Sequence, residues 1–251
     1  MATVGAVYDL TPVPRSPEDI LASADAAASP TSAPVAKDKW LMASVENDAA
    51  AVVAQVFDEG QRRDPGHQRP WVALVDGNNH QIARIKAEAK ARKVRVPIVV
   101  DFIHVLEYLW SAAWCFFAEG DAGAEAWVAD KAMAVLHGQA STVAASVRRK
   151  ATCRRLCPAE RAKADTCAAY LLAKRPYLDY PTALAKGWPI ATGVIEGACR
   201  HLVKDRMDIT GARWSVAGAE AVLKLRALGA NHEFPAYWQF HLSRELQRVH
   251  Q

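Results

Sequence analysis

Two short, fully apolar segments constrain the fold of this chain most strongly. Residues 71–75 read WVALV and residues 97–100 read PIVV. Both are continuous apolar runs of strand length, and helical patterns follow them at 79–93 and at about 102–117. Apolar strands that alternate with helices are typical of a parallel sheet buried on both faces. The sequence therefore predicts an α/β fold.

Each of these two predicted strands ends at an aspartate. Asp76 follows the first and begins the sequence Asp76-Gly77-Asn78, and Asp101 follows the second. Because sites in such sheets form at the carboxyl ends of the strands, both aspartates are candidate site residues. The alternatives are structural: Asp76-Gly77-Asn78 can form only a turn and helix cap, and Asp101 can cap the helix that follows it.

The N-terminal third predicts an antiparallel element before these strands. Residues 2–8 (ATVGAVY) and 39–45 (KWLMASV) have strand composition, and residues 10–37, rich in Pro, Ala, Ser and Asp, predict a mobile loop or hairpin arm. A helix is expected next, capped by Asn47 or Asp48.

The remainder of the chain is predicted to be helical. Residues 120–185 carry helical patterns, a last core helix is expected at about 216–229, and the aromatic tail 234–246 is expected to pack against the body. The predicted organisation is a core in two parts, 1–118 and 187–251, separated by a helical insertion at 119–186.

One carboxylate, Glu196, lies at the start of a segment that is otherwise cationic. On a regular helix, Glu196, Arg200 and Lys204 would lie one turn apart on one side. The opposite side would be apolar, with Ile195, Cys199, Leu202 and Val203. This layout suits a carboxylate that holds a divalent metal beside a phosphate backbone. The alternative is a first-turn glutamate that offsets the helix dipole, with Gly193 as the cap.

The charge distribution is compatible with a phosphate-binding surface in the same region, although a basic block of this kind is most often a solvated face. Residues 148–206 hold 13 Lys and Arg against 5 Asp and Glu, whereas residues 1–70 hold 6 against 10. A basic block of this kind fits nucleic acid as well as a merely solvated face. The five cysteines form no C-x-x-C pair, no apolar run is long enough to span a bilayer, and the N-terminus shows no signal-peptide pattern. We therefore expect a reduced, cytoplasmic setting without a zinc site or a membrane partner.

Three sequence blocks resemble a known family. VALVDGN, VVDFIHVLEYLW and GWPIATGVIEGACRHLVKDRMDITGARWSVAGAEAVLKLRA are similar to transposases of the Kra-type bacterial insertion sequences, which are DDE enzymes related to the Mutator-like group. The order of the predicted elements agrees with a ribonuclease-H-like mixed sheet that lacks its first strand and carries an all-helical insertion. That fold performs two-metal phosphoryl transfer, with two divalent ions roughly 3.5–4 Å apart.

The resemblance implies roles for particular residues. Asp76 would be the second catalytic Asp and Glu196 the final Glu, both as ligands of Mg²⁺ or Mn²⁺. Asp101 and His104 match the family's D-x-x-H signature beside the catalytic centre, although His104 can also be a hydrogen-bonded core histidine. The partners would be DNA and further copies of the chain. The cations expected to contact phosphates are Arg200, Lys204, Arg206 and Arg213.

The chain departs from the family pattern at its beginning. The strand that carries the first catalytic Asp of the family has no counterpart, and Asp9 aligns with the next strand of the pattern. We therefore expect a truncated or split transposase. The alternatives are a catalytically inactive DNA-binding or dimerising remnant, and an unrelated metal-dependent nuclease of the same fold.

Overall fold

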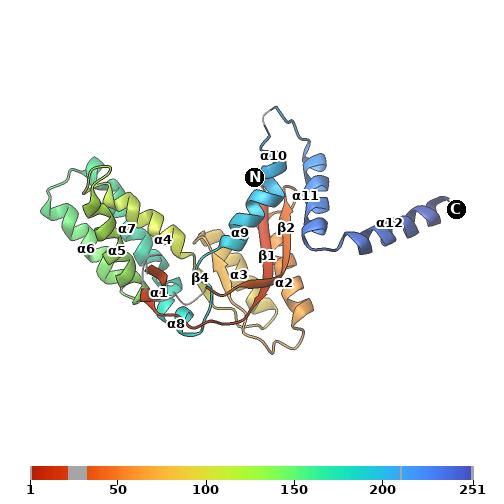
Figure 1. Cartoon of the computed structure of the whole chain (residues 1–251), viewed down its shortest axis with the longest axis horizontal. Helices are drawn as coiled ribbons and strands as arrows, with labels where there is room; N and C mark the ends of the chain where they lie inside the picture. The colour runs from red at the N-terminus through yellow and green to blue at the C-terminus, as the bar shows by residue number, and fades with distance from the viewer. Residues whose placement is uncertain (1, 22–32, 210, 250–251) are drawn as a thin grey trace.

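The computed structural model describes residues 2–21, 33–209 and 211–249 of the chain, which adopt a mixed α/β fold (Figure 1). The strands are β1 (Thr3–Leu10), β2 (Ala36–Ser44), β3 (Ala73–Val75) and β4 (Ile98–Val100). Within the described residues they form two separate two-stranded sheets, β1–β2 and β3–β4, in place of the single mixed sheet predicted. The coarse α/β prediction is confirmed.

The first sheet is antiparallel and packs closely on a helix. Thr3 pairs with Ser44 and Leu10 with Ala36, with an irregularity between Val7 and Asp9. Helix α2 (Ala49–Arg63) lies against β1 at Gly5, where an added Cβ would come within 2.6 Å of Val56 Cγ2. Only glycine allows this approach.

The cap of α2 is one of the two residues that the sequence offered. The side chain of Asp48 accepts a hydrogen bond from the backbone N–H of Ala51 at 2.8 Å, which satisfies one of the free donors of the first turn.

The second sheet is the parallel pair that the apolar runs predict. Ala73 pairs with Ile98 and Val75 with Val100, and helix α3 (Asn79–Ala91) connects the two strands. Burial is complete only toward the carboxyl ends of the strands, because Val75, Val99 and Val100 are buried whereas Ala73, Leu74 and Ile98 are half-buried. Helix α4 (Phe102–Ala113) follows β4 and ends four residues before the predicted end.

The predicted helical insertion forms a bundle whose core is continuous with that of the second sheet. Its helices are α5 (Ala122–Leu136), α6 (Ala140–Cys153), α7 (Pro158–Lys174) and α8 (Tyr180–Ala185), with the short 3-10 helix η1 (Arg175–Tyr177) before α8. Alanine and valine fill most of the interior, so the helices approach one another closely. Figure 1 shows the bundle at the opposite end of the molecule from α11 and α12.

The segment predicted as a mobile loop at 10–37 is partly a fixed structure. Ser16 and Asp19 cap helix α1 (Pro17–Leu21) reciprocally. The backbone N–H groups of Val13 and Arg15 donate to the carbonyl groups of Gly187 and Leu184, at 3.2 and 3.1 Å. The prediction was wrong for residues 12–21, because these hydrogen bonds join positions more than 160 residues apart. Residues 22–32 lie outside the described part of the chain.

The C-terminal core covers the first sheet. Its elements are α9 (Gly193–Ala198), the π-helix η2 (Cys199–Lys204), α10 (Asp205–Met207) and α11 (Val216–Ala230). Ala198, Leu202 and Leu223 are buried together with Ala43 of β2, and Val4 of β1 packs against them.

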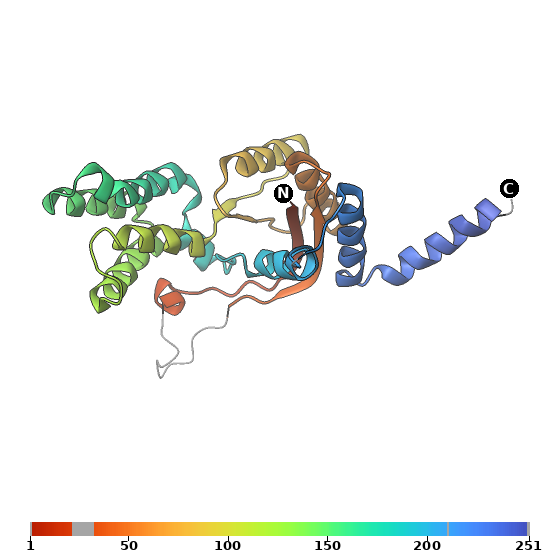
Figure 2. The same cartoon turned by 90° about the horizontal axis from the view of Figure 1, so that it is seen from above.

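The aromatic tail does not pack against the body as predicted. It forms helix α12 (Phe234–Val249), which has no buried residue and projects away from the rest of the molecule (Figures 1 and 2). Asn231 is fixed to β2 by its side chain, and His232 follows with φ 59°, which turns the chain outward. The rings of Phe234 and Trp238 stack on each other at 6.3 Å.

Candidate functional site

The loop after β3 places Asp76 at the carboxyl edge of the parallel pair. Its Oδ1 accepts from the N–H of Asn78 at 2.8 Å, and Asn78 in turn caps α3 by accepting from His80. Gly77 has φ 95°, and a Cβ there would come within 2.8 Å of the Tyr170 hydroxyl. The turn and cap expected of this sequence are therefore confirmed. The Asp76 side chain nonetheless remains exposed, and no ion pair within the described residues involves it.

Asp76 lines an open cavity of about 460 Å³ between its own loop, α4 and α7. The other lining residues are Gly77, Asn78, His104, Glu107, Tyr108, Ser111, Lys163, Thr166 and Tyr170. The structure thus brings together two of the residues that the sequence selected, Asp76 and His104. It adds polar residues that the sequence analysis missed. Those on α4 lie three to four positions apart, as do those on α7. This helical spacing in the sequence could have shown that they share one face of each helix.

His104 is held by a carboxylate on its own helix. Its Nδ1 lies 2.7 Å from Oε2 of Glu107, and its side chain is 38% exposed. The alternative of a core histidine is therefore wrong. A proton on Nδ1 shared with the carboxylate leaves Nε2 available as an acceptor.

Two tyrosines line the cavity beside the loop of Asp76. The rings of Tyr108 and Tyr170 stack at 3.8 Å, and the Tyr170 hydroxyl lies 3.4 Å from the backbone oxygen of Asp76. Burial raises the pKa of Tyr170 well above its usual value, with smaller effects from Tyr108 and Asp76. The phenol therefore stays protonated at neutral pH and acts as a hydrogen-bond donor.

Asp101 joins the second sheet to the helix of Glu196. Its side chain is 1% exposed, and Oδ1 accepts from the N–H of Ile103 at 2.7 Å as the cap of α4. Oδ2 accepts from the N–H of Thr192 at 2.9 Å and from the hydroxyl of the same residue. The predicted cap is confirmed, and a contact with the start of α9 is added. Asp101 does not line the cavity.

Glu196 is exposed on the first turns of α9 and lies outside the cavity lining. The residue that caps α9 is Thr192, not Gly193 as predicted, and its side chain bonds to Asp101. No ion pair within the described ranges involves Glu196. The backbone N–H of Glu196 donates to the carbonyl of Thr192, four residues earlier. Thr192 in turn bonds to Asp101 at the edge of the second sheet.

The cations after Glu196 do not follow a regular helix. A π-helical turn at Cys199–Lys204 interrupts the expected spacing of Glu196 and Lys204. The guanidinium of Arg226 of α11 donates to the carbonyl groups of His201 and Leu202 in this turn and so occupies acceptors of the helical ladder, which accounts for the irregularity.

Four cations remain open to solvent along this segment. Arg200, Lys204, Arg206 and Arg213 are all exposed, and none forms an ion pair with a described residue. The guanidinium of Arg206 lies 5.7 Å from the ring centre of Trp214. Such a surface can accept phosphate groups.

No family model, curated protein or solved structure matches the chain. In residues 2–21, 33–209 and 211–249, no group of three or more His, Cys, Asp or Glu side chains is arranged to hold a metal ion. None of the helices described is long and apolar enough to cross a bilayer.

Proposed function

We propose that this chain carries part of a ribonuclease-H-like transposase core of the Kra type and acts on DNA by metal-dependent strand cleavage and strand transfer. The order of the elements supports the proposal: an antiparallel pair, then a parallel pair whose strands are followed by Asp76 and Asp101, then a helical insertion, then the helix of Glu196. The resemblance of the three sequence blocks gives the catalytic roles.

The proposal rests on the exposure of two carboxylates and on their lack of ion pairs with described residues. Asp76 and Glu196 are both exposed, and neither is neutralised by a described Lys or Arg. The segments that carry them meet at Asp101, which follows β4 and accepts from the start of α9. A carboxylate without a neutralising partner is available to bind a divalent cation.

The donor chemistry fits Mg²⁺ or Mn²⁺ in part. Magnesium takes hard oxygen ligands and is commonly held by one or two carboxylates, with waters and substrate phosphates completing its shell. Asp76 and Glu196 would be those carboxylates. A bound divalent ion would supply Lewis acidity toward a phosphate oxygen. His104, fixed by Glu107, would support the site from the cavity wall.

A second function, DNA binding or dimerisation without catalysis, is favoured by the cationic surface. Arg200, Lys204, Arg206 and Arg213 are exposed and unpaired among the described residues, so they can neutralise phosphates whether or not a metal is held. A protein of this kind would bind DNA competitively with a complete relative.

Titration of Mn²⁺ into the purified protein, followed by calorimetry, tests the first function. Wild type should bind, and Asp76→Ala or Glu196→Ala should weaken binding by at least the roughly tenfold that loss of a partner hydrogen-bonded to a ligand already costs. Asp130→Ala is the matched control, since Asp130 is an exposed carboxylate on α5 whose one ion pair with a described residue is with Lys131. Equal binding by wild type and both site variants would reject the assignment, and absence of binding would favour the non-catalytic function.

A further inference from the structure

Helix α12 presents a row of large apolar side chains to solvent. They recur every three or four residues, so they share one side of the helix, and they form what we call the α12 stripe: Phe234, Trp238, Leu242, Leu246 and Val249. Their exposed fractions range from 45% for Phe234 to 72% for Val249. No described part of the chain therefore covers the stripe.

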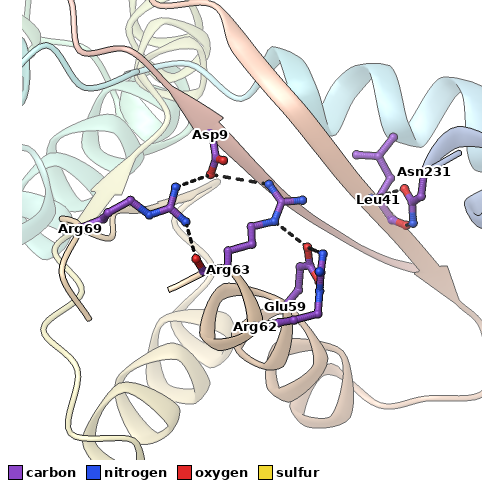
Figure 3. Close-up of polar contacts among 7 residues, drawn as sticks. All are labelled: Asp9, Leu41, Glu59, Arg62, Arg63, Arg69 and Asn231. Atoms are coloured by element: carbon purple, nitrogen blue, oxygen red, sulfur yellow. Dashed lines mark hydrogen bonds and ion pairs between the residues drawn. The ribbon is translucent and has the colours of Figure 1, made fainter. Parts of the chain in front are cut away.

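The elbow between α11 and α12 holds the stripe away from the body. Asn231 ends α11, and its side-chain amide bonds both the N–H and the carbonyl of Leu41 in β2, at 2.7 and 3.1 Å (Figure 3). After the turn at His232, the N–H of Glu233 donates to the carbonyl of Leu228 at 2.9 Å. Folding α12 back onto the body would break these hydrogen bonds, so the stripe is available to another molecule.

The size of the stripe matches that of an interaction site. Because about half of each of its five side chains is exposed, the stripe presents roughly 500 Å² of apolar surface, which is as large as the patches that mark binding sites on monomers. Two stripes that face each other would bury about 1,000 Å² in total, which reaches the lower limit for a specific interface. Helix α12 has 16 residues, a length at which an isolated helix is marginal in water, so packing would also stabilise it.

The two halves of the stripe are complementary to each other. The large rings of Phe234 and Trp238 occupy its amino-terminal half, and the smaller side chains of Leu246 and Val249 occupy its carboxyl-terminal half. In an antiparallel pair of α12 helices with a twofold axis near Leu242, Trp238 of each copy lies beside Leu246 of the other. Phe234 and Val249 meet in the same way at both ends. A parallel pair would instead place ring against ring.

The charges of α12 and the position of the body favour the same arrangement. The formally charged residues of the helix all lie in its second half, where Arg248 pairs with Glu245 at 2.7 Å and Arg244 is exposed. A parallel pair would bring like charges together, whereas an antiparallel pair places the charged half beside the uncharged residues 234–240. Because each body adjoins the amino end of its α12, the antiparallel pair also keeps the two bodies apart (Figures 1 and 2).

We propose that the stripe is covered by α12 of a second copy of this chain, packed antiparallel about a twofold axis near Leu242. Helix α12 lies beyond the three blocks that resemble the transposase family, the last of which ends at Ala227, so the inference rests on this chain's own residues. The residues proposed to hold a metal or to contact phosphates lie outside α12. Failure of this inference would therefore leave the proposed function untouched.

Sedimentation equilibrium of the full chain tests the dimer. Wild type should change from monomer to dimer as its concentration rises through about 1–100 μM, which is the range for a small interface. Leu242→Arg should raise the dimer dissociation constant by about tenfold or more, because it places like charges on the twofold axis. Gln247→Arg is the matched control, since it adds the same charge on the opposite side of α12 and should dimerise as wild type does.

Both variants should keep the circular dichroism spectrum of wild type at low concentration, because α12 has no buried residue. A wild type that stays monomeric throughout, or a dimer that Leu242→Arg does not weaken, would overturn the proposal. Binding of monomeric wild type, but not of Leu242→Arg, to vesicles of phosphatidylglycerol would identify a lipid surface as the occupant and would also overturn it.

Cysteine cross-linking tests the orientation of the pair. Under mild oxidation Leu242→Cys should form a disulfide-linked dimer at a yield above that of wild type, whose exposed Cys153 and Cys157 set the background. Leu246→Cys alone should stay at this background but should cross-link when it is mixed with Trp238→Cys. Background yields for Leu242→Cys, or efficient cross-linking of Leu246→Cys with itself, would contradict the antiparallel pair.

Discussion

Replacing Asp101 by alanine should destabilise the protein far more than the loss of an ordinary helix cap. The buried carboxylate caps α4 through Ile103, and the loss of such a cap costs about 1 kcal/mol. The same carboxylate accepts two hydrogen bonds from Thr192, and donors left without an acceptor in a part-buried site cost about 1–3 kcal/mol. The expected total is about 3 kcal/mol.

Asp121 provides the matched control for this experiment. It caps α5 by accepting from the N–H of Gly123 at 2.8 Å, but it is exposed and has no second partner comparable to Thr192 in the part of the chain that the structure describes. Asp121→Ala should therefore cost only about 1 kcal/mol. The free energies of unfolding come from urea denaturation of the variants at pH 7.

A double-mutant cycle isolates the contribution of the Thr192 contact. Asp101→Ala combined with Thr192→Val should show a coupling energy of about 1–2 kcal/mol, and amide exchange at the start of α9 should accelerate in Asp101→Ala alone. If Asp101→Ala and Asp121→Ala are equally destabilised and the coupling is zero, Asp101 does not join the second sheet to α9, and its role lies elsewhere.

Three further predictions concern the loop, the first sheet and the π-turn. Gly77→Ala should cost about 1–3 kcal/mol in urea denaturation, because alanine is strained at φ 95° and its Cβ would meet the Tyr170 hydroxyl; stability equal to wild type would mean that the loop rearranges freely. Burial opposes ionisation of Glu220, but hydrogen bonds from Val45, Ser44 and Lys224 outweigh it and hold the pKa of its carboxyl below the usual value. The ionised form therefore stabilises the fold above the unfolded-state pKa, and this contribution is lost as pH falls through the lower folded-state pKa. The melting temperature of wild type should accordingly lose its advantage over that of Glu220→Gln across that acidic range. A difference in melting temperature that stays constant with pH would contradict this sign. Arg226→Ala should free the carbonyl groups of His201 and Leu202 and convert the π-turn to a regular helix, visible as changed backbone chemical shifts at Cys199–Lys204; unchanged shifts would assign the turn to another cause.

The local features of the fold were predictable from the sequence because neighbouring residues determine them. The apolar runs before Asp76 and Asp101 gave the parallel pair, and Asp48 and Asp101 are caps because a short carboxylate before an apolar helix satisfies its first donors. Glu196 was placed correctly at the start of a helix.

The features that the sequence did not reveal depend on contacts between distant segments. The π-turn needs Arg226, which lies 24 residues beyond Leu202. The back wall of the cavity comes from Tyr170, 94 residues beyond Asp76. The tail 234–246 has an apolar composition that predicts burial, but burial requires a facing apolar surface, and the turn at His232 directs the helix away from the body. Composition alone cannot supply that geometry.

Both functions proposed above require the cationic surface after Glu196 to bind the phosphate backbone of DNA. Fluorescence anisotropy of a labelled duplex, measured against salt concentration, tests this binding. The four surface cations would be replaced together by glutamine: Arg200, Lys204, Arg206 and Arg213. The control replaces four exposed cations on and after α3: Arg84, Lys90, Lys93 and Arg95.

The first variant should bind DNA more weakly than wild type at every salt concentration. The slope of log affinity against log salt should fall in magnitude by about 0.9 for each phosphate that the variant no longer neutralises, whereas the control should keep the slope of wild type. Equal losses of affinity in both variants would mean attraction by net charge alone, and unchanged affinity of the first variant would show that this surface does not bind DNA.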